Sequence, residues 1–147
     1  MTGGTPEPEA VAFEDVVAVH QLYGRQSHAI DSGRAHEWAA TFTADGEFAS
    51  PSYPAPSVGT AELVAFAERF HAGCVASGET LRHVISTVDV RPGPAPDELS
   101  ARAYLQIIGS PADGSPPRTH RLTVVADELR RTADGWRIGR RTVHRDA

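Results

Sequence analysis

The sequence of 147 residues contains no lysine, and Cys74 is its single cysteine. One cysteine excludes a framework of intrachain disulfides. All 14 positive residues are arginines and the formal net charge is −5, a negative balance that argues against a nucleic-acid partner. No run approaches the roughly 18–20 apolar residues of a membrane span. The segment MTGGTPEPEA lacks the basic start and apolar run of a secretory signal, so we expect a cytoplasmic location.

Motifs that carry cofactor or nucleophile chemistry are also missing. The sequence has neither an HExxH motif nor paired-cysteine spacing, so no metal site is expected. It has no G-x-S-x-G turn for a nucleophilic serine, and no G-x-G-x-x-G or P-loop for a nucleotide. We therefore expect no cofactor, and chemistry that needs only acidic and basic side chains.

The apolar share of the sequence, 40% of residues, is enough for a real core in one domain. Residues 1–11 are rich in Gly, Pro and Thr and predict a flexible tail. Residues 12–147 are expected to form a single domain.

The first predicted helix covers residues 13–31 and carries a stripe that changes from apolar to polar. Val16, Tyr23 and Ile30 flank this stripe. Because a helix that only filled a core would stay apolar, we expect this one to end in a pocket. The predicted inward positions are Phe13, Val17, His20, Gly24, Ser27 and Asp31.

Two shorter helices and one strand are predicted next. A helix over residues 34–42 should bury Ala35, Trp38 and Phe42, and a strand should cover residues 47–50. Three prolines within six residues predict that residues 50–59 form a loop. A third helix is expected over 60–74, with Thr60 as its N-cap.

After Gly78 the apolar period changes from 3.6 to 2, which indicates strands. The Ala-Asp-Gly turn at 133–135 predicts a hairpin. The expected fold is α+β: three N-terminal helices packed on one face of a strongly curved, mostly antiparallel sheet, a cone that encloses a pocket. The predicted strands of this meander cover residues 81–90, 99–109, 119–131 and 136–144.

Asp31 and His83 are the central candidate residues. His83 alternates with Leu81 and Ile85 on one side of its strand, and Asp31 ends the first helix. If both point inward, the carboxylate would hold the imidazole ready to take a proton. The alternative is a hydrogen-bonded core histidine beside a helix-end aspartate. His28, one helical turn before Asp31, could also compete for the carboxylate.

Other candidates could bind a substrate around this pair. Tyr23 and Ser27 lie on the helix that leads to Asp31, although Tyr23 could equally be a core aromatic residue. Tyr53 lies in the proline-rich segment, where it could cover the pocket mouth or be a simple surface tyrosine. Trp38 is expected in the pocket wall or in the plain core.

Arginines gather near the C-terminus. On two paired strands they should alternate between faces and pair across the strands with Asp127 and Glu128. We interpret them as a solvated sheet face, with Asp127 as a cross-strand partner. The arginines are Arg130, Arg131, Arg137, Arg140, Arg141 and Arg145.

Four segments in order, HAIDSGRAHEWAATFTADGEF, GTAELVAF, LRHVIS and ADELRRTADGWRIGRR, resemble the nuclear transport factor 2-like superfamily in its SnoaL-like branch. That branch includes scytalone dehydratase, a dehydrochlorinase, polyketide cyclases and proteins without known activity. The resemblance places Asp31 and His83 where the dehydratase and the dehydrochlorinase carry an acid–base pair. The dehydratase has a second pocket histidine in the next strand, for which Tyr104 or Gln106 would substitute here.

The resemblance implies a cofactor-free cyclase, dehydratase or isomerase that acts on a small hydrophobic natural-product intermediate. It also implies a homodimer paired through the outer sheet face. One alternative is an epoxide hydrolase-type enzyme on the same fold, which usually needs several inward carboxylates and an arginine around one water. The other is a non-catalytic module that binds a small molecule.

Overall fold

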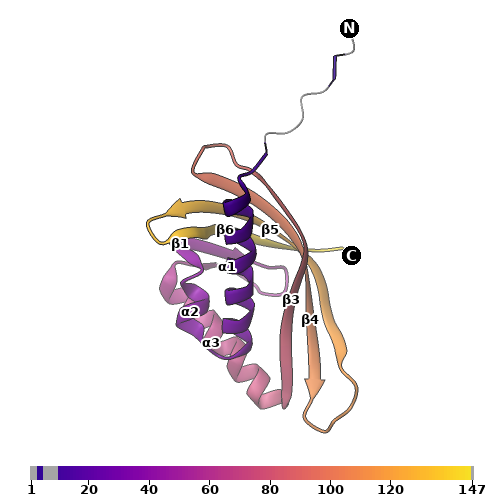
Figure 1. Cartoon of the computed structure of the whole chain (residues 1–147). Helices are drawn as coiled ribbons and strands as arrows, with labels where there is room; N and C mark the ends of the chain where they lie inside the picture. Colours follow the sequence, from indigo (N-terminus) through magenta and orange to yellow (C-terminus); the bar gives the residue numbers. More distant parts are fainter. Residues whose placement is uncertain (1–2, 5–9, 147) are drawn as a thin grey trace.

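The computed structural model describes residues 3–4 and 10–146, and it contains three helices and six strands within them (Figure 1). Most of the predicted tail, and Ala147 of the predicted domain, lie outside the described residues, so the domain boundaries stay a prediction. The elements are α1 (Phe13–Asp31), α2 (Ala35–Ala39), β1 (Phe42–Ala49), β2 (Ser57–Val58), α3 (Thr60–Ser77), β3 (Glu79–Pro92), β4 (Glu98–Pro111), β5 (Arg118–Thr132) and β6 (Gly135–Arg145).

The strands form one sheet in the order β2-β1-β6-β5-β4-β3. The pair β1–β6 is parallel, and every other neighbouring pair in this order is antiparallel. All three helices lie on the same side of the curved sheet, with α1 running along its concave face (Figure 1). The predicted α+β fold with a curved, mostly antiparallel sheet is confirmed.

Irregular pairing positions accompany the curvature of the long strands. The register of β3 against β4 shifts between Ser86 and Asp89, where Thr87 has a positive φ of 54°. The register of β5 against β6 shifts next to Leu129, because Gly139 is an extra residue in β6. Such bulges bend a strand and increase its twist. They help the open sheet to curve around the helices.

The ends of α1 are as predicted, but its predicted inward face is wrong before the last turn; Ser27 and Asp31 do face inward. Phe13 is 77% exposed and Val17 is 41% exposed. Tyr23 and Ile30, expected only to flank the inward stripe, belong to the core. The two candidate stripes lie side by side on the helix, and the one richer in large apolar side chains packs on the sheet. The buried residues of α1 are Val19, Leu22, Tyr23, Gln26, Ala29 and Ile30.

The segment after α1 also differs from its prediction. α2 ends at Ala39, and Phe42 begins β1 rather than ending a helix. The backbone explains this change, because the Ile138 amide donates to the carbonyl of Thr41 at 2.9 Å and joins the chain to β6. β2 lies within the predicted loop and pairs with Glu47 and Phe48.

The predicted cap of α3 is wrong. Thr60 is the first helical residue, and Gly59, with a positive φ of 83°, stands at the cap position. Gly59 has no side chain to cap with. Glu62 serves the preceding turn instead, because its carboxylate accepts a hydrogen bond of 2.9 Å from the Val58 amide.

Candidate active site

Asp31 and His83 lie in direct contact, where the end of α1 meets β3. The Nδ1 atom of His83 is 2.7 Å from Oδ1 of Asp31. The backbone amide of His83 also donates to both carboxylate oxygens, at 3.1 Å each. The Asp31 side chain is 6% exposed and the His83 side chain 15%. A buried carboxylate thus holds both the ring and the backbone of one histidine.

This contact sets the direction of the His83 ring. A carboxylate can only accept hydrogen bonds, so in the neutral imidazole Nδ1 carries the hydrogen and Nε2 keeps a free lone pair. His83 lines an internal cavity, and Asp31 contacts the His83 ring without lining that cavity itself. The ring of Phe70 meets the His83 ring edge-on, with centroids 5.2 Å apart. The free ring nitrogen therefore belongs to a sheltered, largely apolar site.

The cavity has an aromatic wall and an aliphatic wall. Phe66 is the centre of the aromatic wall: its ring centroid lies 4.9 Å from those of Phe48 and Tyr53, and 5.4 Å from that of Trp38. The opposite wall comes mainly from the inward positions of the sheet. Aromatic and aliphatic side chains of this kind are suited to pack against a flat apolar ring. The aliphatic residues are Ile30, Ile85, Leu105, Ile107 and Val143.

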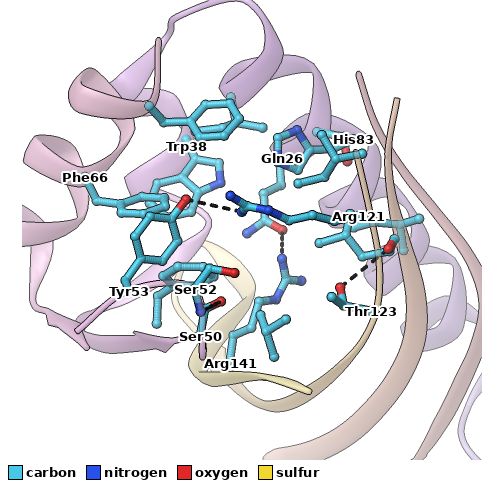
Figure 2. Close-up of a pocket in the computed structure, with 18 residues that line it drawn as sticks. Gln26, Trp38, Ser50, Ser52, Tyr53, Phe66, His83, Arg121, Thr123 and Arg141 are labelled. Atoms are coloured by element: carbon cyan, nitrogen blue, oxygen red, sulfur yellow. Dashed lines mark hydrogen bonds between the residues drawn. The ribbon is translucent and has the colours of Figure 1, made fainter. Parts of the chain in front are cut away.

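One end of the cavity is polar because Arg141 borders it. Nε and Nη2 of Arg141 donate to the two oxygens of Asp127 at 2.8 and 2.7 Å. Nη1 donates to Oε1 of Gln26 at 2.6 Å, a contact visible in Figure 2. The Tyr23 hydroxyl donates to Asp127 at 2.6 Å, and the Gln26 amide donates to Thr41 at 2.7 Å. The buried charge is thus paired and enclosed by hydrogen bonds.

Tyr23 and Arg141 of this network both keep their protons near neutral pH. Burial first, and then the negative charge of Asp127, raise the pKa of the Tyr23 hydroxyl far above its usual range, so the phenol keeps its proton. Burial alone would lower the pKa of Arg141. The adjacent Asp127 carboxylate outweighs this, and the pKa of the guanidinium is raised.

Tyr53 and Arg121 stand at the mouth of the cavity. The Arg121 guanidinium lies 5.9 Å from the centre of the Tyr53 ring, and its Nη1 is 3.5 Å from the Tyr53 hydroxyl. Figure 2 shows the Arg121 side chain directed towards the Tyr53 hydroxyl. Behind them the free volume is about 50 Å³, room for a few water molecules. A ring-sized ligand therefore requires these two side chains to move.

Four of the predicted site residues border this cavity together, namely Ser27, Trp38, Tyr53 and His83. Tyr23 does not reach it, because its hydroxyl turns to Asp127 beneath the polar end. His28, the predicted competitor for Asp31, lies on the exposed side of α1. The catalytic and binding roles themselves stay predictions.

The placement of Tyr104 and Gln106 in the pocket is wrong. Tyr104 is 49% exposed and lies on the outer face of β4. Successive strand residues point to opposite faces, and Leu105 and Ile107 take the inward positions of β4. Neither outer residue can replace the second pocket histidine of the dehydratase.

The interpretation of the C-terminal arginines as a solvated face fails at Arg141. The cross-strand pair with Asp127 exists, but both side chains are buried. The extra residue Gly139 reverses the alternation of β6, so Ile138 and Arg141 both face inward. Gln26, Arg121 and Thr123 also line the cavity and were not predicted. A single glycine inside the strand was the only local signal of the bulge.

The helices over a curved sheet, with a cavity between them, define a nuclear transport factor 2-like fold. The family model that describes the SnoaL-like domain matches residues 11–142, and the chain belongs to this family. No curated protein matches the sequence. Among the described residues, no helix is both long and apolar enough to cross a membrane.

Three solved structures illustrate the likeness. ActVI-ORFA of Streptomyces coelicolor is 31% identical, with 89% of this chain and 96% of that chain covered and a TM-score of 0.77. Aln2 of another Streptomyces is 26% identical, with 94% of this chain and 95% of that chain covered and a TM-score of 0.80. A protein of Catenulispora acidiphila in complex with S-DNPA is 28% identical, with 87% of this chain and 90% of that chain covered and a TM-score of 0.74.

Proposed function

We propose that the protein is a cofactor-free acid–base enzyme that cyclises, dehydrates or isomerises a small hydrophobic carbonyl compound. The observation that carries this proposal is the 2.7 Å contact between Asp31 and Nδ1 of His83, at the wall of a largely apolar cavity. Membership of the SnoaL-like family supports a role with a small molecule, of the kind that polyketide cyclases perform.

The first step is removal of a proton from a carbon next to the substrate carbonyl. Nε2 of His83 accepts this proton, and Asp31 stabilises the imidazolium that forms. The C–H electron pair moves into the carbonyl and creates an enolate. A positioned base of this kind contributes about 10²–10⁴-fold in rate, or about 3–5 kcal/mol of barrier.

The enolate oxygen needs a positive partner, and we assign this role to the buried Arg141, which lines the cavity. Three of its five N–H groups are used in the hydrogen bonds with Asp127 and Gln26 found among the described residues, which leaves two for a ligand. A fixed guanidinium in an apolar cavity stabilises developing negative charge strongly. Ser27, on the same cavity wall, is a further hydrogen-bonding group for the substrate.

The fate of the enolate distinguishes the three reactions. If the imidazolium returns its proton to another carbon, the product is an isomer. If it protonates a hydroxyl on the neighbouring carbon, water leaves and the product is an alkene. If the enolate carbon attacks a second carbonyl of the same molecule, a ring closes and the new alkoxide takes the proton. All three begin with the same proton transfer to His83.

The epoxide hydrolase alternative gains one inward carboxylate from the structure, Asp127, next to Arg141. However, Asp127 does not border the cavity, and both of its oxygens accept hydrogen bonds from Arg141 and Tyr23. It is not free to activate a water molecule. This arrangement favours enolate chemistry over epoxide opening.

Proton exchange tests the proposal without knowledge of the natural substrate. A panel of two- and three-ring aromatic ketones is titrated by tryptophan fluorescence, since Trp38 lines the cavity. Those that bind are incubated in D₂O, and exchange at the carbon next to the carbonyl is followed by proton NMR. We expect wild-type protein to accelerate exchange, and His83→Ala to lose about 10²–10⁴-fold.

His144→Ala is the matched control, because His144 is an exposed histidine of β6. This variant should exchange at the wild-type rate. If the bound ketones exchange no faster with wild-type protein than with His83→Ala, the protein is a binding module and the enzymatic proposal is wrong.

A further inference from the structure

A second hollow, the outer groove, adjoins the cavity at its mouth. The two share Tyr53, Phe66, Phe70 and Arg121. The outer groove has a free volume of about 420 Å³, against about 50 Å³ for the cavity. A molecule bound at His83 that extends past Arg121 can therefore enter this groove.

The outer groove is positively charged in a protein whose net charge is −5. Arg69, Arg118 and Arg121 line it, and Glu79 is the one carboxylate among its lining residues in the described part of the chain. Glu79 is already occupied: it accepts a hydrogen bond of 3.0 Å from Arg118 and contacts the ring of His120. The groove thus keeps a positive excess from Arg69 and Arg121.

Within the described ranges, neither of these two arginines has a carboxylate within salt-bridge distance. Among the described residues, the hydrogen bond found for the Arg121 side chain is a long one of 3.5 Å to the Tyr53 hydroxyl, and its guanidinium also lies over the Tyr53 ring. A negatively charged ligand group would form a charge-assisted, bidentate contact instead, which is roughly twice as strong as a neutral hydrogen bond. Arg121 is therefore the natural first contact for an anion that arrives at the mouth.

We propose that the outer groove binds a carboxylate carried on a short side chain of the substrate. The substrate class is then an aromatic ring system with an acidic side chain, placed with its ring in the cavity and its carboxylate between Arg69 and Arg121. This inference rests on the proposed function only in taking the cavity as the ring site. It also explains how the mouth opens, because a carboxylate that binds Arg121 removes that guanidinium from Tyr53.

Two ligands that differ only in charge test the inference. 2-Naphthylacetate carries the carboxylate, and 2-naphthylacetamide has the same shape without the charge. We expect wild-type protein to bind the acid at least about ten-fold more tightly than the amide at low salt, measured by fluorescence titration. The preference should shrink with added salt, because exposed charges are screened.

Three variants locate the effect. Arg121→Gln should abolish most of the preference for the acid, and Arg69→Gln should reduce it. Arg102→Gln removes an exposed arginine from the outer face of β4 and should leave the preference unchanged. These arginines are exposed, so the fold should tolerate each change.

The outcomes separate this inference from the proposed function. His83→Ala should keep the preference for the acid while it loses proton exchange. Equal binding of acid and amide by wild-type protein, or a preference that survives in both Arg121→Gln and Arg69→Gln, would overturn the inference and leave the proton-exchange result standing. Failure of both ligands to bind, when neutral ketones do bind, would overturn it as well.

Discussion

The carboxylate of Asp31 accepts hydrogen bonds from both the ring and the backbone amide of His83, residues 52 positions apart in the sequence. The end of α1 is thereby joined to β3 at the wall of the cavity. The double contact fixes the orientation of the imidazole as well as the position of its nitrogen. It is the structural basis for treating His83 as a base.

Asp31→Asn should disturb the tautomer of His83. An amide can donate as well as accept, so the hydrogen need no longer stay on Nδ1. In ¹⁵N NMR spectra we expect wild-type protein to show protonated Nδ1 and unprotonated Nε2, and the variant to show a mixture. Exchange activity should fall towards that of His83→Ala. Asp89→Asn, an exposed change in the same strand β3, is the control and should alter neither property.

Tyr23→Phe should lower stability at neutral pH and change its alkaline dependence. Removal of the hydrogen bond to Asp127 should cost about 1.5–3 kcal/mol of unfolding free energy, because the acceptor is charged. Urea unfolding at pH 7 measures this loss.

The sign of the pH effect follows from the raised pKa of Tyr23. Below pH about 10, the usual pKa of tyrosine, the phenol is protonated in both states and its stabilisation is fully present. Above that pH the unfolded state loses the proton first, so stability falls as pH rises. The chain has no lysine to obscure this range. Tyr23→Phe should flatten the decline, and an unchanged slope would contradict the buried, protonated phenol.

Asp127→Asn should be strongly destabilising. It leaves the buried guanidinium of Arg141 without its counter-charge, which typically costs about 3–5 kcal/mol. A second experiment uses the single variants Asp127→Leu and Arg141→Met and the double variant that combines them. The double variant should lose less unfolding free energy than the sum of these two single losses, since no charge is left buried. Urea unfolding of all variants forms the cycle. A fully additive result would mean that the two side chains do not interact.

The sequence predicts the order of the elements apart from β2, the curved sheet, and a contact between Asp31 and His83. It does so because strong periodicity and glycine-rich turns mark the elements, and because the family resemblance supplies the pair. The face of α1 is harder to predict. The predicted inward stripe and the buried stripe of α1 are offset from each other by one residue. Only packing against the sheet decides that Tyr23 and Ile30 are buried while Val17 is not.

The remaining wrong predictions at the site concern which face of the sheet a strand residue points to. The family resemblance predicts Tyr104 in the pocket from its strand, but Leu105 and Ile107 occupy the inward positions of β4. Arg141 was missed because Gly139 shifts the alternation of β6 by one residue. A bulge depends on how two strands pair, and the pattern of one strand does not contain that information.

The most direct test of His83 as the catalytic base is to remove its side chain and supply free imidazole in solution. His83→Gly leaves a space beside Asp31 that an added imidazole can occupy. For a ketone that this variant binds, we predict very slow exchange in D₂O and recovery that saturates with imidazole concentration, with much less recovery in the double variant His83→Gly and Asp31→Asn. Exchange at the wild-type rate in His83→Gly without imidazole would contradict the account.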